Sequence, residues 1–361
     1  MTISRRRKVV FALASIAGSA LAMLIALLAI DVYLHTRFQR SAGFNVWGYR
    51  GPVAGRKQKT EYRIAMVGGS SAYGYGVTWD QAIPARLEQH LAKLALAGRT
   101  FKVLNLGYNN EGAYSFVVTL TDYAYLDYDL VCLYEGYNDL VGDPRGPNVS
   151  VFRHESPVFR LTGYLPIFPI VFKEKAAAML NGGDPGALYR SETKTVFHPG
   201  AAATVTAAAL RTVGEMSQTL ERQLGRVVEE PARHIDAPDA TGCKYPWGQY
   251  CRSVSNGVGF ALQHDKQVLF ITQPYEAVSP SRHARHIEQQ REAAAMVARM
   301  FGRDPRVRYV NLGDAIDLTD STLSFDRMHL TAEGNVRIAE RLVAPVVDMA
   351  SRRASGTSVH R

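Results

Sequence analysis

Cysteine is scarce in this sequence, with only three residues in 361. Cys243 and Cys251 flank a short polar and aromatic segment, and no third or fourth ligand stands nearby at the spacing of a zinc finger, which argues against a metal site there. A disulfide between these two cysteines would fit a protein outside the cytosol, and two unpaired thiols are the alternative. Cys132 lies in an apolar run, so we expect a buried and unreactive thiol.

Stretches that alternate basic and aromatic residues, as in proteins that bind single-stranded nucleic acid, are also missing. The formal net charge of +9 therefore does not indicate a nucleic acid partner, and part of this excess lies in Arg5-Arg6-Arg7-Lys8. Hydrophobic residues make up 47% of the chain and charged residues 21%, which is ordinary for a globular protein. The chain can therefore bury a substantial core.

Charge is absent from residues 9–30, which are mostly apolar. About 20 such residues suffice for a helix to cross the hydrocarbon core of a bilayer. The basic cluster before them should stay in the cytoplasm, which places everything after Asp31 on the far side of the membrane. A cleaved signal peptide is the alternative, but the run exceeds the usual apolar region of about 7–15 residues and no convincing small-x-small site follows. We therefore predict a cytoplasmic segment at 1–8 and an uncleaved transmembrane anchor at 9–30.

A basic connector at 31–60 leads to a domain at 61–350, in which short apolar strands alternate with helical segments, and a polar tail follows at 351–361. The expected strands are 63–67, 101–106, 130–134, 267–272 and 307–312, and the expected helices include 81–96, 115–125 and 332–350. This alternation predicts an α/β fold, a mostly parallel five-stranded sheet covered by helices on both faces. A long insertion at about 142–263 either forms a lid over the sheet edge or packs on it as decoration.

The glycine-rich stretch 64–76 (IAMVGGSSAYGYG) lacks what a nucleotide-binding loop needs. A P-loop requires a lysine after its last glycine, and none follows Gly74 or Gly76. A dinucleotide fingerprint requires a third glycine, but residues 77–79 (VTW) follow Gly76. Both phosphate-binding interpretations therefore fail on residue identity.

What is present fits a serine nucleophile. A serine hydroxyl attacks an acyl group only when a base takes its proton, a third group holds that base, and donors stabilise the oxyanion. Candidates for each role follow the expected strands: Ser70 follows the first, Gly107 the second, Asn138 the third, and Asp326 and His329 the fifth. Ligands of open α/β sheets bind at this edge of the sheet.

Four motifs in this order resemble those of the SGNH, or GDSL-type, hydrolases. Gly68-Gly69-Ser70 stands where the family usually has Gly-Asp-Ser, and Gly107 follows. Gly136-Tyr137-Asn138-Asp139 matches Gly-x-Asn-Asp, and Asp326-Arg327-Met328-His329 matches Asp-x-x-His. The resemblance covers roughly residues 62–349 apart from the insertion, and it implies the flavodoxin-like three-layer α/β/α sandwich of that family. Gly69 in place of the usual Asp suggests a sub-branch with a different turn or substrate.

The resemblance implies a role for each matched residue. Ser70 would attack an ester carbonyl, His329 would be its general base, and Asp326 would fix the imidazole tautomer. The backbone N–H groups of Ser70 and Gly107 and the side-chain amide of Asn138 would form the oxyanion hole. Glycine at 107 fits a backbone that approaches the substrate closely. Hydrolysis would run through an acyl-enzyme without a metal or cofactor.

The location and the resemblance together predict a membrane-anchored serine esterase with its catalytic domain outside the cytoplasm, in the periplasm. Its substrate would be an O-acyl group on a cell-envelope or secreted carbohydrate. The alternatives are an O-acyltransferase that uses the same triad, a lipid esterase or thioesterase, and a non-catalytic scaffold for polysaccharide assembly.

Four further polar residues are not expected to be catalytic residues or metal ligands. Ser71 is the alternative nucleophile, but the register of the motif favours Ser70. Asp139 should be a turn or helix-capping residue. His283 and His286 lie three residues apart on an expected helix, and we expect them to form a solvated basic face rather than a metal site.

Overall fold

The computed structural model describes residues 4–38, 43–94, 98–140, 151, 153–171 and 241–356, with side chains except at residues 38 and 353–356. The chain divides into two compact units. The first contains Met1–Gln39 and Tyr164–Glu229, and the second contains Arg40–Gly163 and Glu230–Arg361. Every residue of the expected site belongs to the second unit.

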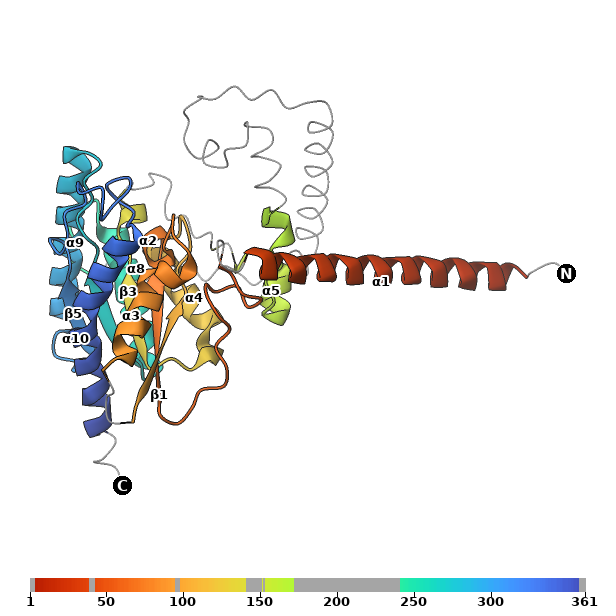
Figure 1. Ribbon diagram of the computed structural model, residues 1–361, viewed down its shortest axis with the longest axis horizontal. Coiled ribbons are helices and arrows are strands. Elements are labelled where there is room, and N and C mark those ends of the chain that lie inside the picture. The colour runs from red at the N-terminus through yellow and green to blue at the C-terminus, as the bar shows by residue number, and fades with distance from the viewer. Residues whose placement is uncertain are drawn as a thin grey trace. The chain divides into compact units, whose positions relative to one another are not determined.

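The first unit contains the long helix α1 (Arg5–Phe38), drawn in red in Figure 1. Within the described ranges it is the one helix that is long and apolar enough to cross a membrane, a test that a signal sequence would also pass. Near its C-terminal end, the buried carboxylate of Asp31 accepts the backbone N–H groups of Ile167 at 2.7 Å and Phe168 at 2.6 Å. These bonds fix the end of α1 to the segment 164–168.

The second unit contains a five-stranded sheet in which every pair of neighbouring strands is parallel. The strands lie in the order β2 (Thr100–Asn105), β1 (Glu61–Gly68), β3 (Leu130–Tyr134), β4 (Gln267–Thr272) and β5 (Val307–Asn311). β1, β3 and β4 are buried along nearly their whole length, which explains why they are continuous apolar runs in the sequence. The prediction of a five-stranded, mostly parallel sheet is confirmed.

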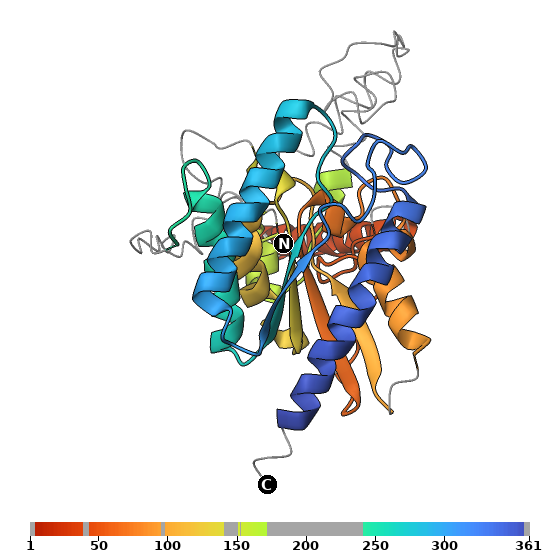
Figure 2. The same ribbon diagram turned by 90° about the vertical axis from the view of Figure 1, so that its left-hand side faces the viewer.

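Helices cover both faces of this sheet. On one face, α3 (Ile83–Ala92) and α10 (Ala332–Gly356) pack together against strand residues such as Ile64, Met66 and Cys132. On the other face lie α4 (Phe116–Asp122), α8 (Gly248–Gln263) and α9 (Pro280–Phe301). Figure 2 shows α9 and α10, in light and dark blue, flanking the fan of strands. Shorter elements are α2 (Ser70–Tyr73), α5 (Pro157–Thr162) and 3₁₀ turns at Trp79–Gln81, Ala113–Ser115, Ala124–Leu126 and Tyr137–Asp139.

The expected helices and the insertion differ from the observed elements. The helix expected at 81–96 begins only at Ile83, after a 3₁₀ turn, and has Pro84 in its first turn, where proline is well tolerated. Most of the segment expected as an insertion, including its alanine-rich part at 201–230, lies outside the described residues. The last 16 residues of the expected insertion form α8 (Gly248–Gln263), which contacts β3, β4, α4 and α9. α8 therefore belongs to the layer that covers the sheet.

Part of the segment expected as a connector at 31–60 packs into the second unit. Arg50 is buried, and its guanidinium donates to the carbonyl oxygens of Tyr73, of Gly74 at 2.7 Å and of Val77 at 2.6 Å. These carbonyl oxygens lie at and beyond the end of α2. Arg50 therefore fixes the turn that ends the helix carrying Ser70.

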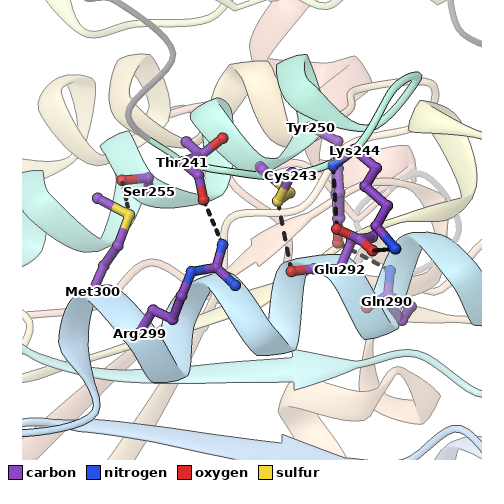
Figure 3. The surroundings of a disulfide bond; sticks show 10 residues. Thr241, Cys243, Lys244, Tyr250, Ser255, Gln290, Glu292, Arg299 and Met300 are labelled. Atoms are coloured by element: carbon purple, nitrogen blue, oxygen red, sulfur yellow. Dashed lines mark hydrogen bonds and ion pairs between the residues drawn. A yellow bond between two sulfur atoms is a disulfide. The ribbon is translucent and has the colours of Figure 1, made fainter.

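The structure joins Cys243 and Cys251 in a disulfide (Figure 3). Cys251 lies in α8 and Cys243 in the loop before it. In the same loop, the carbonyl oxygen of Thr241 accepts a hydrogen bond of 2.6 Å from Arg299 of α9. The loop is thus held to both helices. Cys132 is buried in β3, and burial raises the pKa of its thiol to about 12, as expected for an unreactive cysteine.

Candidate active site

The candidate site lies at the carboxyl ends of the central strands. β1 lies between β2 and β3 in the sheet, so the segments that follow these three strands meet at one edge. Ser70 begins α2 just after β1, Gly107 follows β2, and Asn138 lies in the 3₁₀ turn after β3. The strand order brings together residues that are far apart in the sequence.

Three side chains form a continuous series of hydrogen bonds. Ser70 Oγ lies 2.8 Å from His329 Nε2, and His329 Nδ1 lies 2.6 Å from Asp326 Oδ2. Ser70 and His329 are both buried. A hydroxyl, an imidazole and a carboxylate in this order can pass the hydroxyl proton to the imidazole, while the carboxylate stabilises the resulting cation. The structure thus brings together the three residues that were expected to carry catalysis.

A tight turn fixes Asp326 against the imidazole. Its Oδ1 accepts the backbone N–H groups of Met328 at 3.0 Å and His329 at 2.6 Å, and Arg327 between them has a left-handed backbone, with φ of 65°. Burial acts to raise the pKa of Asp326, but the hydrogen bonds from His329 and Met328 outweigh it and hold the pKa below its usual value. Asp326 is therefore ionised at neutral pH, as the partner of an imidazolium must be.

The geometry also distinguishes the two neighbouring serines. Ser71 Oγ is buried and has no hydrogen-bond partner in the described part of the chain, whereas Ser70 Oγ contacts His329 Nε2. Because a serine hydroxyl needs a base to become a nucleophile, Ser70 is placed for attack and Ser71 is not.

Two of the three expected oxyanion donors already have acceptors. The N–H of Gly107 donates to the side-chain oxygen of Asn105 at 3.2 Å, and the amide of Asn138 donates to the carbonyl oxygen of Glu111 at 2.9 Å. The Asn138 amide retains a second hydrogen. The N–H of Ser70 stands in the first turn of a helix, where N–H groups lack acceptors within the helix. Ser70 and Asn138 thus have hydrogens for an oxyanion, whereas Gly107 would have to share its own with Asn105.

Glycine at 107 also has a packing role that the sequence did not predict. A Cβ at this position would lie 2.6 Å from the backbone nitrogen of Tyr73 and 2.9 Å from the Cβ of Ala72. Any side chain would therefore collide with α2. Gly107 therefore lets the loop after β2 pack against the helix that carries Ser70.

Two exposed aromatic rings flank the imidazole, and neither was predicted from the sequence. Tyr75 is 41% exposed, with its ring centroid 4.8 Å from that of His329. Phe325 is 47% exposed and stacks on His329 with a centroid distance of 5.8 Å and an angle of 14° between the planes. Their only sequence signal was their closeness to the motifs. Large apolar side chains left exposed beside a reactive group are candidate ligand contacts.

His286 does not lie on a solvated basic face, so that expectation is wrong. Its side chain is buried against the ring of Tyr137 at a centroid distance of 4.9 Å, and its Nδ1 accepts the backbone N–H of Glu276 at 3.2 Å. Burial, together with the nearby His283 and Arg282, lowers the pKa of His286 to about 3. The sequence could not show that the loop after β4 covers this part of α9. Within the described ranges, no group of three or more His, Cys, Asp or Glu side chains could hold a metal ion.

Comparisons with known proteins give only distant similarities. No protein-family model and no curated protein matches the chain. Solved structures do match. One is a protein of the G-D-S-L family from Desulfitobacterium hafniense, with 9% identity, covering 78% of this chain and 98% of that chain at a TM-score of 0.41. A second is a lipase/acylhydrolase from Enterococcus faecalis, with 14% identity, covering 79% of this chain and 95% of that chain at a TM-score of 0.43. A third is a family 3 carbohydrate esterase from Clostridium thermocellum, with 10% identity, covering 81% of this chain and 99% of that chain at a TM-score of 0.41. Similarities at this level do not identify a reaction, so the function rests on the residues of the site.

Proposed function

We propose that this protein is a serine-dependent ester hydrolase of the SGNH type that acts through an acyl-enzyme on Ser70. The observation that carries the proposal is the series Ser70 Oγ, His329 and Asp326 Oδ2, joined by contacts of 2.8 and 2.6 Å. The four sequence motifs support the same roles. A buried serine in contact with a base, itself in contact with an ionised carboxylate, is the arrangement that makes a hydroxyl nucleophilic.

In the first half-reaction, His329 Nε2 takes the proton of Ser70 Oγ as this oxygen attacks the ester carbonyl carbon. Negative charge develops on the carbonyl oxygen, to which the N–H of Ser70 and the amide of Asn138 would donate. The N–H of Gly107 would join them by sharing its hydrogen with Asn105. The C–O bond to the alcohol then breaks, and His329 gives its proton to the departing oxygen. Asp326 stabilises the imidazolium throughout.

In the second half-reaction, a water molecule replaces the alcohol. His329 takes a proton from this water as its oxygen attacks the acyl carbon, and the same donors hold the oxyanion. The bond to Ser70 Oγ breaks, the serine regains its proton from His329, and the carboxylic acid leaves. An acyltransferase would use a sugar hydroxyl in place of the water and the same proton transfers.

We further propose that α1 anchors the second unit outside the cytoplasm, with the basic residues 5–8 on the cytoplasmic side. The disulfide between Cys243 and Cys251 supports an oxidising compartment such as the periplasm. The substrate we favour is an O-acylated carbohydrate of the cell envelope. Tyr75 and Phe325 support this choice, because a sugar ring can lay its C–H face on an aromatic ring while its hydroxyl groups stay in water.

The full chain in detergent micelles tests the nucleophile. We expect it to hydrolyse short-chain nitrophenyl esters and to be inactivated by a fluorophosphonate, which mimics the tetrahedral intermediate. Fragment ions of the modified peptide should place the adduct on Ser70. An absence of hydrolysis, or an adduct on Ser71, would contradict the proposal. Product analysis with an added sugar acceptor would show whether the acyl group goes to water or to the sugar.

Replacing either exposed ring should change the choice of substrate. We expect Tyr75→Ala and Phe325→Ala to lower kcat/KM for an O-acetylated glycoside about 3- to 10-fold more than kcat/KM for ethyl acetate, because ethyl acetate has no sugar ring to stack. The matched control is Tyr125→Ala, an exposed tyrosine in the 3₁₀ turn before β3, at the opposite edge of the sheet. An equal loss on both esters would count against a sugar contact, and a larger loss on ethyl octanoate would indicate an acyl-chain site instead.

A further inference from the structure

A buried carboxylate that the proposed reaction does not use lies behind the nucleophile. Glu135 directly follows β3 and is 1% exposed. Its Oε2 accepts the backbone N–H of Gly69, and its Oε1 accepts the backbone N–H of Asn138 at 3.0 Å. Burial, and then the charge of Asp139, act to raise the pKa of Glu135, whereas the backbone N–H groups of Asn138 and Gly69 act to lower it. In the described part of the chain Glu135 forms no ion pair, so backbone N–H groups are what stabilises it.

Both N–H groups belong to the proposed catalytic apparatus. Gly69 directly precedes Ser70, and Asn138 carries the side-chain amide proposed for the oxyanion. Burying a carboxylate without a cation is unfavourable, so it is stabilising only if its hydrogen bonds are well made. Glu135 thus joins the segment that carries the nucleophile to the segment that carries an oxyanion donor.

The space around Gly69 shows how closely these groups meet. A Cβ on residue 69 would lie 2.3 Å from Glu135 Oε2 and 2.3 Å from Asn138 Nδ2. No side chain fits there while Glu135 keeps its position. An aspartate at 69, as in the usual motif of the hydrolases that the sequence resembles, would compete with Glu135 for this space. The carboxylate at this point therefore comes from the end of β3, and the absence of a side chain on residue 69 makes room for it.

Hydrogen bonds from two of the covering helices hold the backbone of Glu135 in place. Its carbonyl oxygen accepts the hydroxyl of Tyr250 at 2.7 Å, and this hydroxyl accepts the Nε2 amide of Gln290 at 3.0 Å. Tyr250 in α8 directly precedes Cys251 of the disulfide, and Gln290 lies in α9 (Figure 3). The end of β3 is thus fixed by α8 and α9, two of the three helices on that face of the sheet.

We propose that Glu135 is a positioning residue that holds the backbone of Gly69 and of Asn138 in the geometry that attack by Ser70 requires. This inference rests on the proposed esterase function. Glu135 contacts no reacting atom, and it acts through the two segments to which it is bonded. A misplacement of about 1 Å at a reacting group can cost about 100-fold in rate, so the loss of either bond should be visible in kcat.

Glu135→Gln tests the proposal in the full chain in detergent. The amide keeps the size of the side chain but has a single oxygen, so one of the two N–H groups would face an NH₂ group instead of an acceptor. We expect kcat for nitrophenyl acetate to fall about 100-fold, with KM changed less than about threefold, because positioning affects the transition state more than substrate binding.

Asp129→Asn is the matched control. Asp129 directly precedes β3, is buried, and accepts the backbone N–H of Arg63 at 2.8 Å, so it also joins β1 to the segment of β3, at the opposite end of these strands. Unlike Glu135, it also forms an ion pair with Lys57 Nζ at 2.8 Å. Its kcat should stay within about threefold of the wild type even if the variant is less stable. A kcat for Glu135→Gln within about threefold of the wild type, or equal losses in the two variants, would overturn the proposal.

Amide hydrogen exchange gives a second measurement that needs no catalysis. Glu135→Gln should speed exchange in peptides covering residues 68–72 and 136–140, whereas Asp129→Asn should do so around residues 61–66. Unchanged exchange at 68–72 and 136–140 in Glu135→Gln would overturn the proposal. A wild type that hydrolyses no ester would instead refute the proposed function, and the exchange data would still decide whether Glu135 holds these two segments.

Discussion

Replacing Ser70 by alanine should lower kcat for ester hydrolysis by about 10⁴- to 10⁶-fold. The substitution removes the hydroxyl that contacts the imidazole of His329, so no acyl-enzyme can form on residue 70. The remaining rate would come from water attacking a substrate that the oxyanion donors still polarise. Steady-state hydrolysis of nitrophenyl acetate by the full chain measures the loss. A fluorophosphonate should no longer label the variant.

Ser71→Ala is the matched control for this prediction. Its hydroxyl is buried and has no hydrogen-bond partner among the described residues, so its removal should leave kcat within about threefold of the wild type. The opposite pattern, with Ser71→Ala inactive and Ser70→Ala active, would identify Ser71 as the nucleophile. Full activity in both variants would rule out a serine mechanism at this site.

Asp326→Asn should lower kcat at neutral pH by about 10⁴-fold. Oδ1 of Asp326 accepts hydrogen bonds from the backbone N–H groups of Met328 and His329. In the variant, the amide oxygen will take this position because only an acceptor fits there, and the NH₂ group will then face Nδ1 of His329. Nδ1 must therefore accept, which leaves the ring proton on Nε2, the atom that has to take the proton of Ser70. The imidazole is held in the wrong tautomer.

Asp320→Asn controls for the loss of a turn. Asp320 Oδ1 also accepts a backbone N–H two residues on, that of Thr322 at 2.8 Å, but it does not contact the imidazole. We expect unchanged kinetics in this variant. A small effect of Asp326→Asn, similar to that of Asp320→Asn, would show that Asp326 only shapes the loop. Proton NMR of the imidazole N–H resonances in the two variants would report the tautomer directly.

Several features could be predicted from local sequence alone. Both faces of β1, β3 and β4 are buried in the core, so these strands are continuous apolar runs that can be recognised without a structure. α1 is equally visible, because its long apolar part is exposed and has no counterpart in an ordinary core. The prediction of an α/β fold with helices on both faces of a five-stranded sheet is confirmed.

Other residues gave no local signal because their roles depend on distant contacts. Arg50 looked like part of a basic connector, yet it holds the carbonyl oxygens after α2. His286 looked solvated, yet the loop after β4 covers it. Glu135 is a charged residue after an apolar strand, and only the approach of Gly69 from the neighbouring strand explains it. In each case the partner lies on another element, and local pattern carries no information about which elements become neighbours.

Motifs and apolar runs are local properties, so the amino-acid sequence was enough to predict the kinds of residue at the site and the strands that present them. The tertiary structure alone decided which of them meet. Placing β1 beside β3 brought Gly69 to Glu135, and the fold brought His329 to the hydroxyl of Ser70 and not to that of Ser71. These outcomes depend on strand order and on contacts of a few ångströms between distant segments, which arise only when the whole core packs.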